Sequence, residues 1–376
     1  MDAAELPQVD IAIAGGGPVG CALALALSES GISVARISDE AEVSDRPIAL
    51  SYGSRLILER IGAWDRVETS PIRSIHVSQR GFGRTVMRCS DYGLPALGYV
   101  VGYSDLLALL ASRTPCIPGS MESWEQSRDD IAVQLSVAER EARIRARLLV
   151  LADGGLNRGG VRVKDYRQQA VVAAVVAESD PRGVAWERFT PEGPLALLPF
   201  GDRLALIWSV HPETADELRA LTDADFLGRL RVAFGGRLGD FLSTGPRSSF
   251  PLSLRRGAIR PSPRVLAIGN AAQTLHPVAG QGLNLGLRDA WELAQMLLDA
   301  SKEEIGSESF LARYARRRSV DRYAGIGFTD FLVSAFSNSA PLLALARGAG
   351  LAMLDLVPPA RHFLVRRMIY GARALP

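Results

Sequence analysis

A glycine-rich stretch near residue 280 has the residue types and the spacing of a ligand-binding loop. Gly280, Gly282 and Gly286 lie between an apolar run at residues 265–268 and a segment at 287–298 whose apolar residues recur at helical spacing. This order predicts a buried strand, a loop and then a helix. Glycines let a backbone approach a flat ligand, and the N–H groups at the start of a helix attract negative charge. We expect this loop to hold a ligand that becomes anionic, such as reduced flavin at N1 and O2.

A second glycine motif lies near the start of the chain. Residues 9–14 are apolar, Gly15, Gly17 and Gly20 follow with the spacing GxGxxG, and an alanine- and leucine-rich helical segment comes next. In this context the spacing is typical of dinucleotide binding; the alternative is an unrelated tight turn. Pro18 fits a first helical turn, where its missing N–H is not needed. The residues expected to contact the ligand are Gly15, Gly17, Pro18, Val19 and Gly20.

The second predicted strand, residues 32–37, ends without the usual acidic residue. A dinucleotide fingerprint has a carboxylate there that binds the adenosine ribose, but this chain has Ser38, followed by Asp39 and Glu40. Either Asp39 takes this place after a small shift, or Ser38 makes one weaker hydrogen bond. The sequence leaves both possibilities open.

Four segments together resemble the FAD-dependent aromatic hydroxylases of ubiquinone biosynthesis, and the resemblance covers nearly the whole chain. The segments are residues 15–20, the Asp-Arg block at 45–46, the Ala-Asp-Gly block at 152–154 and the loop at 268–286. The family usually has aspartate and histidine where this chain has Asn270 and Gln273. These two residues resemble the 2-polyprenyl-6-methoxyphenol hydroxylase branch in particular.

The resemblance implies several contacts with FAD. Arg46 would meet the pyrophosphate or the flavin edge, and Asn270 would bond the ribityl chain or a phosphate. Asp153 and Gly154 would lie near the pyrophosphate and the entering nicotinamide. Read alone, Arg46 could belong to a surface salt bridge and Asp153 to a turn. The family continues with Ser-x-x-Arg, from which residues 157–160 depart, and this leaves the docking of the nicotinamide open.

The resemblance also assigns roles around the glycine-rich loop. Backbone N–H groups at Gly282, Leu283 and Asn284 would face flavin N1 and O2. Pro277 would shape the wall beside the reacting face of the flavin, and His276 would be either a structural hydrogen-bonding residue or a proton shuttle. The cofactor-binding residues implied for this loop are Asn270, Gly280, Gln281, Gly282, Leu283 and Asn284.

The remaining elements predict a mixed α/β fold. A Rossmann-like FAD-binding domain is expected to interleave with a β-sheet substrate domain and to be followed by a C-terminal helical region. Residues 185–199 and 204–209 read as two strands joined by a turn at 201–202, and the family places them as the wall facing the flavin. The residues expected in this substrate wall are Phe189, Pro194, Leu195 and Ala196. The expected boundaries are 1–70, 98–165 and 255–310 for the FAD domain, 71–97 and 166–254 for the substrate domain, and 311–376 for the helical region.

Composition excludes several classes of protein. The 376-residue chain is 47% hydrophobic and 22% charged, which is ordinary for a soluble globular protein, and its net charge of +2 argues against a nucleic-acid partner. Three cysteines without CxxC spacing predict a reduced, cytoplasmic setting, and the N-terminus lacks the pattern of a signal peptide. Four scattered histidines predict no metal site, and no GxSxG, P-loop or HExxH motif is present.

The C-terminal region combines basic and apolar character. From Leu311 onward there are ten arginines and three aspartates, yet between Tyr323 and Ala360 only Asp330, Arg347 and Asp355 are charged. The basic excess fits a solvated helical face, or attraction to an anionic membrane or an acidic partner. The apolar stretch fits helices that dock on the main domain, or a path for a polyprenyl tail.

The function implied by the resemblance is flavin-dependent hydroxylation of a polyprenylated phenol. NADH or NADPH would reduce FAD, and a flavin C4a-hydroperoxide would transfer oxygen from O₂ to the ring, at C1 of 2-polyprenyl-6-methoxyphenol. Two alternatives stay open: another ring position in the same pathway, or a flavin-free scaffold protein of a biosynthetic complex. The departures at Ser38, residues 157–160 and Asn270 allow the scaffold, whereas the intact glycines argue for the enzyme.

Overall fold

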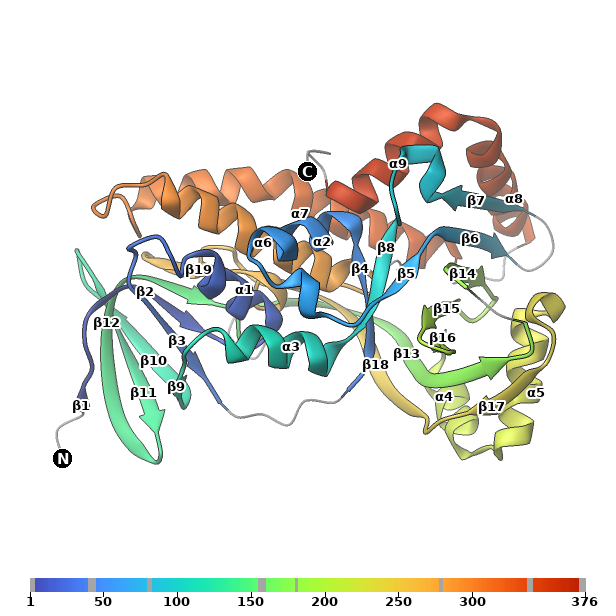
Figure 1. Ribbon diagram of the computed structural model, residues 1–376, viewed down its shortest axis with the longest axis horizontal. Coiled ribbons are helices and arrows are strands. Elements are labelled where there is room, and N and C mark those ends of the chain that lie inside the picture. Colours follow the sequence, from blue (N-terminus) through green and yellow to red (C-terminus); the bar gives the residue numbers. More distant parts are fainter. Residues whose placement is uncertain are drawn as a thin grey trace.

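The computed structural model describes residues 4–39, 45–79, 83–154, 160–179, 182–276, 280–336 and 341–371. Within them the chain builds three sheets, with a cluster of helices over the first and a row of C-terminal helices along one side (Figure 1). The mixed α/β architecture with an interleaved FAD-binding domain and C-terminal helices is therefore confirmed. The expected domain boundaries stay a prediction.

The first sheet has a parallel centre. Its middle strands are β2 (Val9–Ala14), β3 (Val34–Ser38), β12 (Arg140–Leu151) and β19 (Val265–Ala267). Most of their residues are buried, except in the N-terminal half of β12, where Arg140, Glu141 and Arg145 are exposed. Helices α1 (Pro18–Ala26) and α6 (Gln281–Leu298) cover one face of the sheet. Burial on both faces explains why these strands read as continuous apolar runs instead of alternating ones. The other strands of this sheet are β1 (Ala4–Glu5), β9 (Ile117–Pro118), β10 (Ser120–Gln126) and β11 (Ile131–Val137).

The second sheet is mostly antiparallel and lies at the opposite end of the molecule (Figure 1). Its strand order is β20-β18-β13-β16-β15-β14-β6-β7, and β17 pairs with β13. The bounds are β6 (Ser74–Gln79), β7 (Arg84–Arg88), β13 (Arg162–Ala177), β14 (Val184–Phe189), β15 (Pro194–Phe200), β16 (Arg203–Val210), β17 (Phe241–Thr244), β18 (Ser248–Arg256) and β20 (Gln273–Thr274).

One strand prediction was wrong in this sheet. Residues 185–199 form two antiparallel strands, β14 and β15, and not one. A tight turn separates them: Thr190 donates its backbone N–H to the carbonyl of Gly193, whose φ of +157° favours glycine. The turn at residues 201–202 then joins β15 to β16.

A small third sheet connects the two ends. It consists of β4 (Pro47–Ser51), β8 (Gly98–Gly102) and β5 (Ser70–Ile72), in the order β4-β8-β5. The helices after these strands are α2 (Tyr52–Arg60) and α3 (Tyr103–Ser112). Helices α4 (Pro212–Ala220) and α5 (Asp223–Phe234) cover one face of the second sheet, where Phe226 of α5 and Trp208 of β16 belong to the same buried cluster. Short 3-10 turns lie at Trp64–Arg66, Cys89–Tyr92, Gly236–Leu238 and Gly269–Ala271 (η4).

Three helices follow the first-sheet domain. The long α7 (Glu308–Phe336) runs along the molecule, and α8 (Pro341–Leu356) and α9 (Pro358–Tyr370) return over the end of the second sheet (Figure 1). No helix within the described ranges has the length and apolar character needed to cross a membrane.

Candidate functional site

One cavity of about 1860 Å³ lies between the first and second sheets. Residues of both glycine motifs, of the ends of β3 and β12, of the second sheet and of the C-terminal helices line it. Pockets for drug-sized ligands are typically about 300–1,000 Å³. The cavity therefore has room for a dinucleotide and a second, apolar ligand.

The first glycine motif lies at one end of this cavity. Gly15 has a φ of +140°, and an added Cβ would lie 2.4 Å from the carbonyl carbon of Ala152. A Cβ on Gly20 would lie 2.6 Å from the carbonyl oxygen of Gly15. A Cβ on Gly17, in contrast, would meet nothing closer than the Tyr103 hydroxyl at 3.9 Å. Gly15 and Gly20 thus allow the turn to pack closely, whereas Gly17 faces open space where a phosphate can approach.

Val19 explains how this turn is held against the second motif. Its methyl groups would lie 3.2 Å from a Cβ on Gly269 and 2.7 Å from one on Gly286. The valine side chain therefore fits between η4 and α6, where only glycine leaves room for it. Pro18 is the first residue of α1 and also lines the cavity, as predicted for a first helical turn.

Ser38 and Asp39 both line the cavity beyond the end of β3. The Ser38 hydroxyl donates to the carbonyl of Asp39 (3.0 Å) and lies where a Cβ on Gly16 would stand. Asp39 is exposed. A contact of either residue with the adenosine ribose stays a prediction.

Arg46 lines the cavity next to Tyr103, the first residue of α3. Its guanidinium lies 4.7 Å from the centre of the Tyr103 ring, and its carbonyl accepts a hydrogen bond from the Tyr103 N–H. Stacking on the ring orients the cation without neutralising it, which suits a residue that binds phosphate. Burial raises the pKa of Tyr103, although Arg46 opposes this, so the ring stays neutral.

Asp153 and Gly154 follow β12, and Asn270 follows β19, its parallel neighbour. The two strand ends bring them together: a Cβ on Gly154 would lie 3.9 Å from that of Asn270. All three line the cavity, and Asn270 is exposed to it. The carboxyl ends of parallel strands are where such sheets place their ligands.

Helix α6 begins directly beside this point. Gly280 has a left-handed φ of +58°, and a Cβ on Gly282 would meet nothing within 4 Å. Gly280, Gly282 and Leu283 line the cavity, so the first turn of α6 presents its N–H groups to it. Gln281 and Asn284 belong to the same turn but are not among the lining residues.

The Asn284 side chain has a structural role that the sequence did not indicate. Its oxygen accepts hydrogen bonds from Ser51 N (2.8 Å) and Ser54 Oγ (2.7 Å), and its amide donates to the carbonyls of Ala49 (3.0 Å) and Gly280 (2.6 Å). Buried and fully bonded, it fixes the start of α6 to β4 and α2.

His276 lies at the edge of the site and is not among the lining residues. It is completely buried, and its ring stands edge-on to Tyr166 at 5.3 Å. Burial lowers its pKa to about 4, so the imidazole is neutral near pH 7. Pro277, the other residue expected to act here, lies outside the described residues.

Three of the four residues predicted for the substrate wall, Phe189, Pro194 and Ala196, line the cavity, and their contact with substrate stays a prediction. Leu195 is not brought to the cavity. It belongs to the opposite face of β15, where it packs in one buried cluster with residues of α4 and α5 and with its cross-strand partner Trp208. Alternation along a strand places neighbours on opposite faces, so residues 194–196 could not all face the cavity.

These residues fit FAD. Gly17 and Gly282 leave open space at two helix starts where a Cβ would protrude toward a ligand, and Arg46 and the helix N-termini supply positive charge. The far end of the cavity is apolar. Residues 8–322 match the FAD binding domain family.

Two curated relatives are similar over most of the chain. The chain is 34% identical to the ubiquinone hydroxylase UbiL of Rhodospirillum rubrum, over 95% of this chain and 88% of that protein. It is 32% identical to the 3-demethoxyubiquinol 3-hydroxylase of Escherichia coli, over 91% and 93%. The chain belongs to the FAD-dependent hydroxylase family of ubiquinone biosynthesis.

The fold of this flavin hydroxylase also matches solved structures. The p-nitrophenol 4-monooxygenase PnpA of Pseudomonas putida superimposes with a TM-score of 0.75 over 98% of this chain and all of that one, at 19% identity. The hydroxylase is an FAD-dependent aromatic-ring monooxygenase.

Two residues of the hydroxylase were missed by the sequence analysis. Asp289 accepts hydrogen bonds from Gly269 N (3.1 Å) and Gln273 Nε2 (3.1 Å), and Arg318 of α7 pairs with it at 2.7 Å. The loop that contains Gly269 and Gln273 is therefore bonded to Asp289 of α6. Glu187 lies among the lining residues of the second sheet. A single acidic residue in a strand usually indicates a solvent-facing position, and no local signal marks either residue as part of the site.

Proposed function

We propose that this hydroxylase adds oxygen to the ring of a polyprenylated phenol in ubiquinone biosynthesis, at C1 of 2-polyprenyl-6-methoxyphenol, with NADH or NADPH as electron donor. The observation that carries the proposal is the 1860 Å³ cavity, in which both glycine motifs open onto an apolar wall from the second sheet. The printed names of the relatives support the pathway.

Bound FAD supplies electron transfer and the activation of O₂, which side chains cannot provide. The residues of the chain bind and orient. Arg46 and the starts of α1 and α6 hold the phosphates and stabilise negative charge that develops beside α6. Phe189 and Ala196 present an apolar surface that keeps water from the reacting ring. His276, neutral near pH 7, serves as a structural residue beside Tyr166 and not as an acid.

The C-terminal helices give the prenyl tail a path. Leu351 and Leu354 of α8 and Leu364 and Met368 of α9 also line the cavity. A ring held against the second sheet would direct its tail between these two helices. This favours the polyprenyl path over simple docking as the role of the apolar stretch.

A second candidate is hydroxylation of another ring carbon. The name of the Escherichia coli relative, 3-demethoxyubiquinol 3-hydroxylase, favours it. Asn270 faces the cavity, but Gln273 is buried against Asp289, so only one of the two residues that distinguish the first branch can contact a ligand.

The test is a turnover assay with FAD, NADH or NADPH, isotopically labelled O₂ and a short-chain 2-prenyl-6-methoxyphenol. We expect labelled oxygen para to the phenol hydroxyl, located by mass spectrometry and NMR. The same phenol with a methyl group at the para carbon is the control and should give no labelled product. Parallel reactions with a short-chain 3-demethoxyubiquinol distinguish the second candidate. Oxidation of the nicotinamide with hydrogen peroxide release but no labelled product from either ring would contradict both substrates.

A further inference from the structure

Glu187 places a carboxyl group on the cavity face of the second sheet. Its cross-strand neighbours are Val77 of β6 and Ala196 of β15, and all three line the cavity. Along β14, Ala185 and Phe189 line it too, because side chains two residues apart point to the same face. The side chains around Glu187 are therefore apolar.

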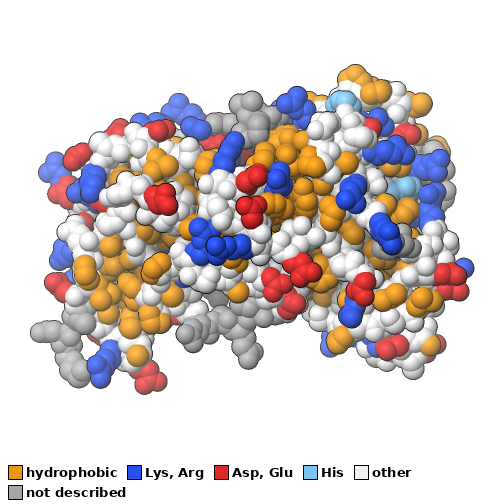
Figure 2. Space-filling view, viewed as in Figure 1, with side chains coloured by type: hydrophobic (Ala, Val, Ile, Leu, Met, Phe, Trp, Pro, Cys, Tyr) orange, Lys and Arg blue, Asp and Glu red, His pale blue; other side chains and the backbone are white. Residues whose placement is uncertain are grey.

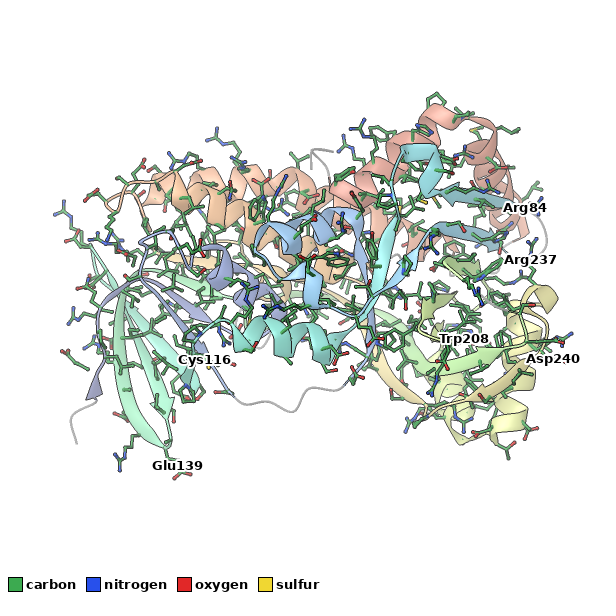
Figure 3. The ribbon with its side chains drawn as sticks, viewed as in Figure 1. Arg84, Cys116, Glu139, Trp208, Arg237 and Asp240 are labelled. Carbon is green, nitrogen blue, oxygen red and sulfur yellow. The ribbon has the colours of Figure 1, made fainter. Side chains whose placement is uncertain are left out.

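The nearby basic groups lie on the other face of the same strands. His76 packs on Trp186 at 4.7 Å, and Arg84, Arg188 and Arg237 lower the pKa of His76 after the larger effect of burial. Figure 3 shows Arg84 and Arg237 at this end of the molecule, and a separate small pocket contains both. The sheet thus separates Glu187 from these cations.

The carboxyl group of Glu187 is not engaged by the protein. Within the described part of the chain it has no hydrogen-bond or ion-pair partner, and loss of hydration raises its pKa to about 7. Thr85, on the cavity face of β7, donates to Asp355 at 3.3 Å and not to Glu187. The other charged residues that line the cavity are Asp39, Asp45, Arg46, Asp153, Arg203, Arg247 and Arg347.

Glu187 is within reach of the flavin loop. Ala185, two residues away and about 6.6 Å along the strand, packs in one cluster with Ala49 and Leu198. A Cβ on Gly280 would lie 3.2 Å from the Ala49 side chain. A phenol ring placed between Gly280 and β14 would therefore lie against Glu187.

We propose that Glu187 is the general base of the hydroxylation and accepts the proton of the phenol hydroxyl. The inference rests on the proposed function. In this step the phenolic O–H bond breaks, an O–H bond forms on the Glu187 carboxylate, and the electron pair stays on the phenol oxygen. From there it raises the electron density of the ring at the para carbon, which attacks the activated oxygen. A base that titrates near neutral pH is well matched to this transfer.

The experiment compares the FAD-loaded wild type with E187Q and E187D. We expect E187Q to form labelled product roughly 10²- to 10⁴-fold more slowly, with continued nicotinamide oxidation and release of hydrogen peroxide. Wild-type product formation should fall as the pH drops below about 7, because the base becomes protonated. In E187Q, the rate of product formation should no longer fall at acidic pH. E187D should restore part of the wild-type rate and, with it, a fall of the rate at acidic pH. The control E178Q changes an exposed carboxylate directly after β13 and should behave as wild type.

A second measurement does not depend on turnover. The infrared band of a protonated carboxyl group that E187Q removes should titrate near pH 7 and should shift when the short-chain phenol binds. The assignment is overturned if the wild type makes product and E187Q makes as much with the same pH dependence, or if no band titrates above pH 6. If the wild type makes no labelled product, the proposed function fails and the assignment falls with it.

Discussion

The glycines of the site have two different roles, and the structure shows which glycine has which role. Gly15 and Gly20 are packed against backbone atoms and would clash with any side chain. Gly17 and Gly282 have room for a side chain in the protein alone, so we expect a side chain at these two positions to meet the bound cofactor and not the protein. This difference can be measured because it separates folding from cofactor binding.

The substitution Gly17→Ala should leave the stability of the FAD-free chain unchanged and weaken FAD binding. The added methyl group would stand in the cavity where the pyrophosphate approaches, and we expect a loss of affinity of roughly tenfold or more. Fluorescence titration gives the affinity and thermal unfolding the stability. Gly228→Ala, in an exposed helical position of α5 with open space around it, is the matched control. Equal FAD affinity in both variants would place the phosphates elsewhere.

Most of the residues predicted to bind the cofactor line the cavity, whereas the prediction for the substrate end placed Leu195 wrongly and omitted Glu187. The spacing of the glycines indicates the turn that they form. Residues 15–20 and 280–283 could therefore be recognised as ligand-binding loops from the sequence alone. Leu195 was placed on the wrong face because alternation gives two faces of a strand but not which one meets a cavity. Glu187 was missed because its chemistry comes from the apolar side chains around it, which belong to strands far away in the sequence.

At the scale of elements, a buried ionic network joins η4, α6 and α7. Asp289 binds the backbone of Gly269 and pairs with Arg318, which also pairs with Asp321 at 2.8 Å, and Asp321 pairs with Arg288 at 3.0 Å. The loop that carries Asn270 is thus fixed to the first C-terminal helix. Sequence could predict each helix from its periodicity, but not this pairing, since residues 29 positions apart meet only through packing.

Breaking the Asp289–Arg318 pair should both destabilise the folded chain and weaken FAD binding. We expect Asp289→Asn to lower the free energy of unfolding by about 1–3 kcal/mol, because Arg318 would stay buried with only one of its two carboxylate partners, Asp321. In a double-mutant cycle with Arg318→Met, the loss in the double variant should be smaller than the sum of the single losses. Urea unfolding and FAD titration measure both effects.

The exposed pair Asp216–Arg219 gives the control for this cycle. Asp216→Asn should change stability by less than about 1 kcal/mol, as is usual for a surface ion pair. A strictly additive cycle at residues 289 and 318 would show that the two side chains do not stabilise one another.

At the scale of the whole molecule, the C-terminal helices have an apolar outer surface as well as an inner one. Figure 2 shows hydrophobic side chains gathered where α8 meets α9, with basic side chains nearby. Met353, Leu356, Val357 and Phe363 are exposed there, and Leu356 is 81% accessible. Two arginines of the basic excess, Arg318 and Arg322, are buried, so only part of the excess reaches the surface.

This surface, which we call the α8–α9 tip, should bind membranes. Vesicles that contain anionic lipid are expected to retain the protein at low salt and release it at high salt, because screening weakens the attraction of the remaining arginines. The double substitution Leu356→Ser and Phe363→Ser should reduce retention in a sedimentation assay. Val232→Ser removes a side chain that is 72% exposed on α5 and serves as the control. Equal retention of the two variants would argue for another contact surface or a soluble partner.

The interleaved order of the strands also determines when the cofactor site can form during synthesis. Strand β19 pairs with β12, yet it leaves the ribosome more than 100 residues later. At roughly 5–20 residues per second, that interval is on the order of 6–20 s. During this time the C-terminal half of β12 presents an open edge that other chains can pair with. A newly made chain therefore cannot capture FAD to protect itself until the second sheet has been translated, and cofactor supply can rescue only chains that have already reached α6.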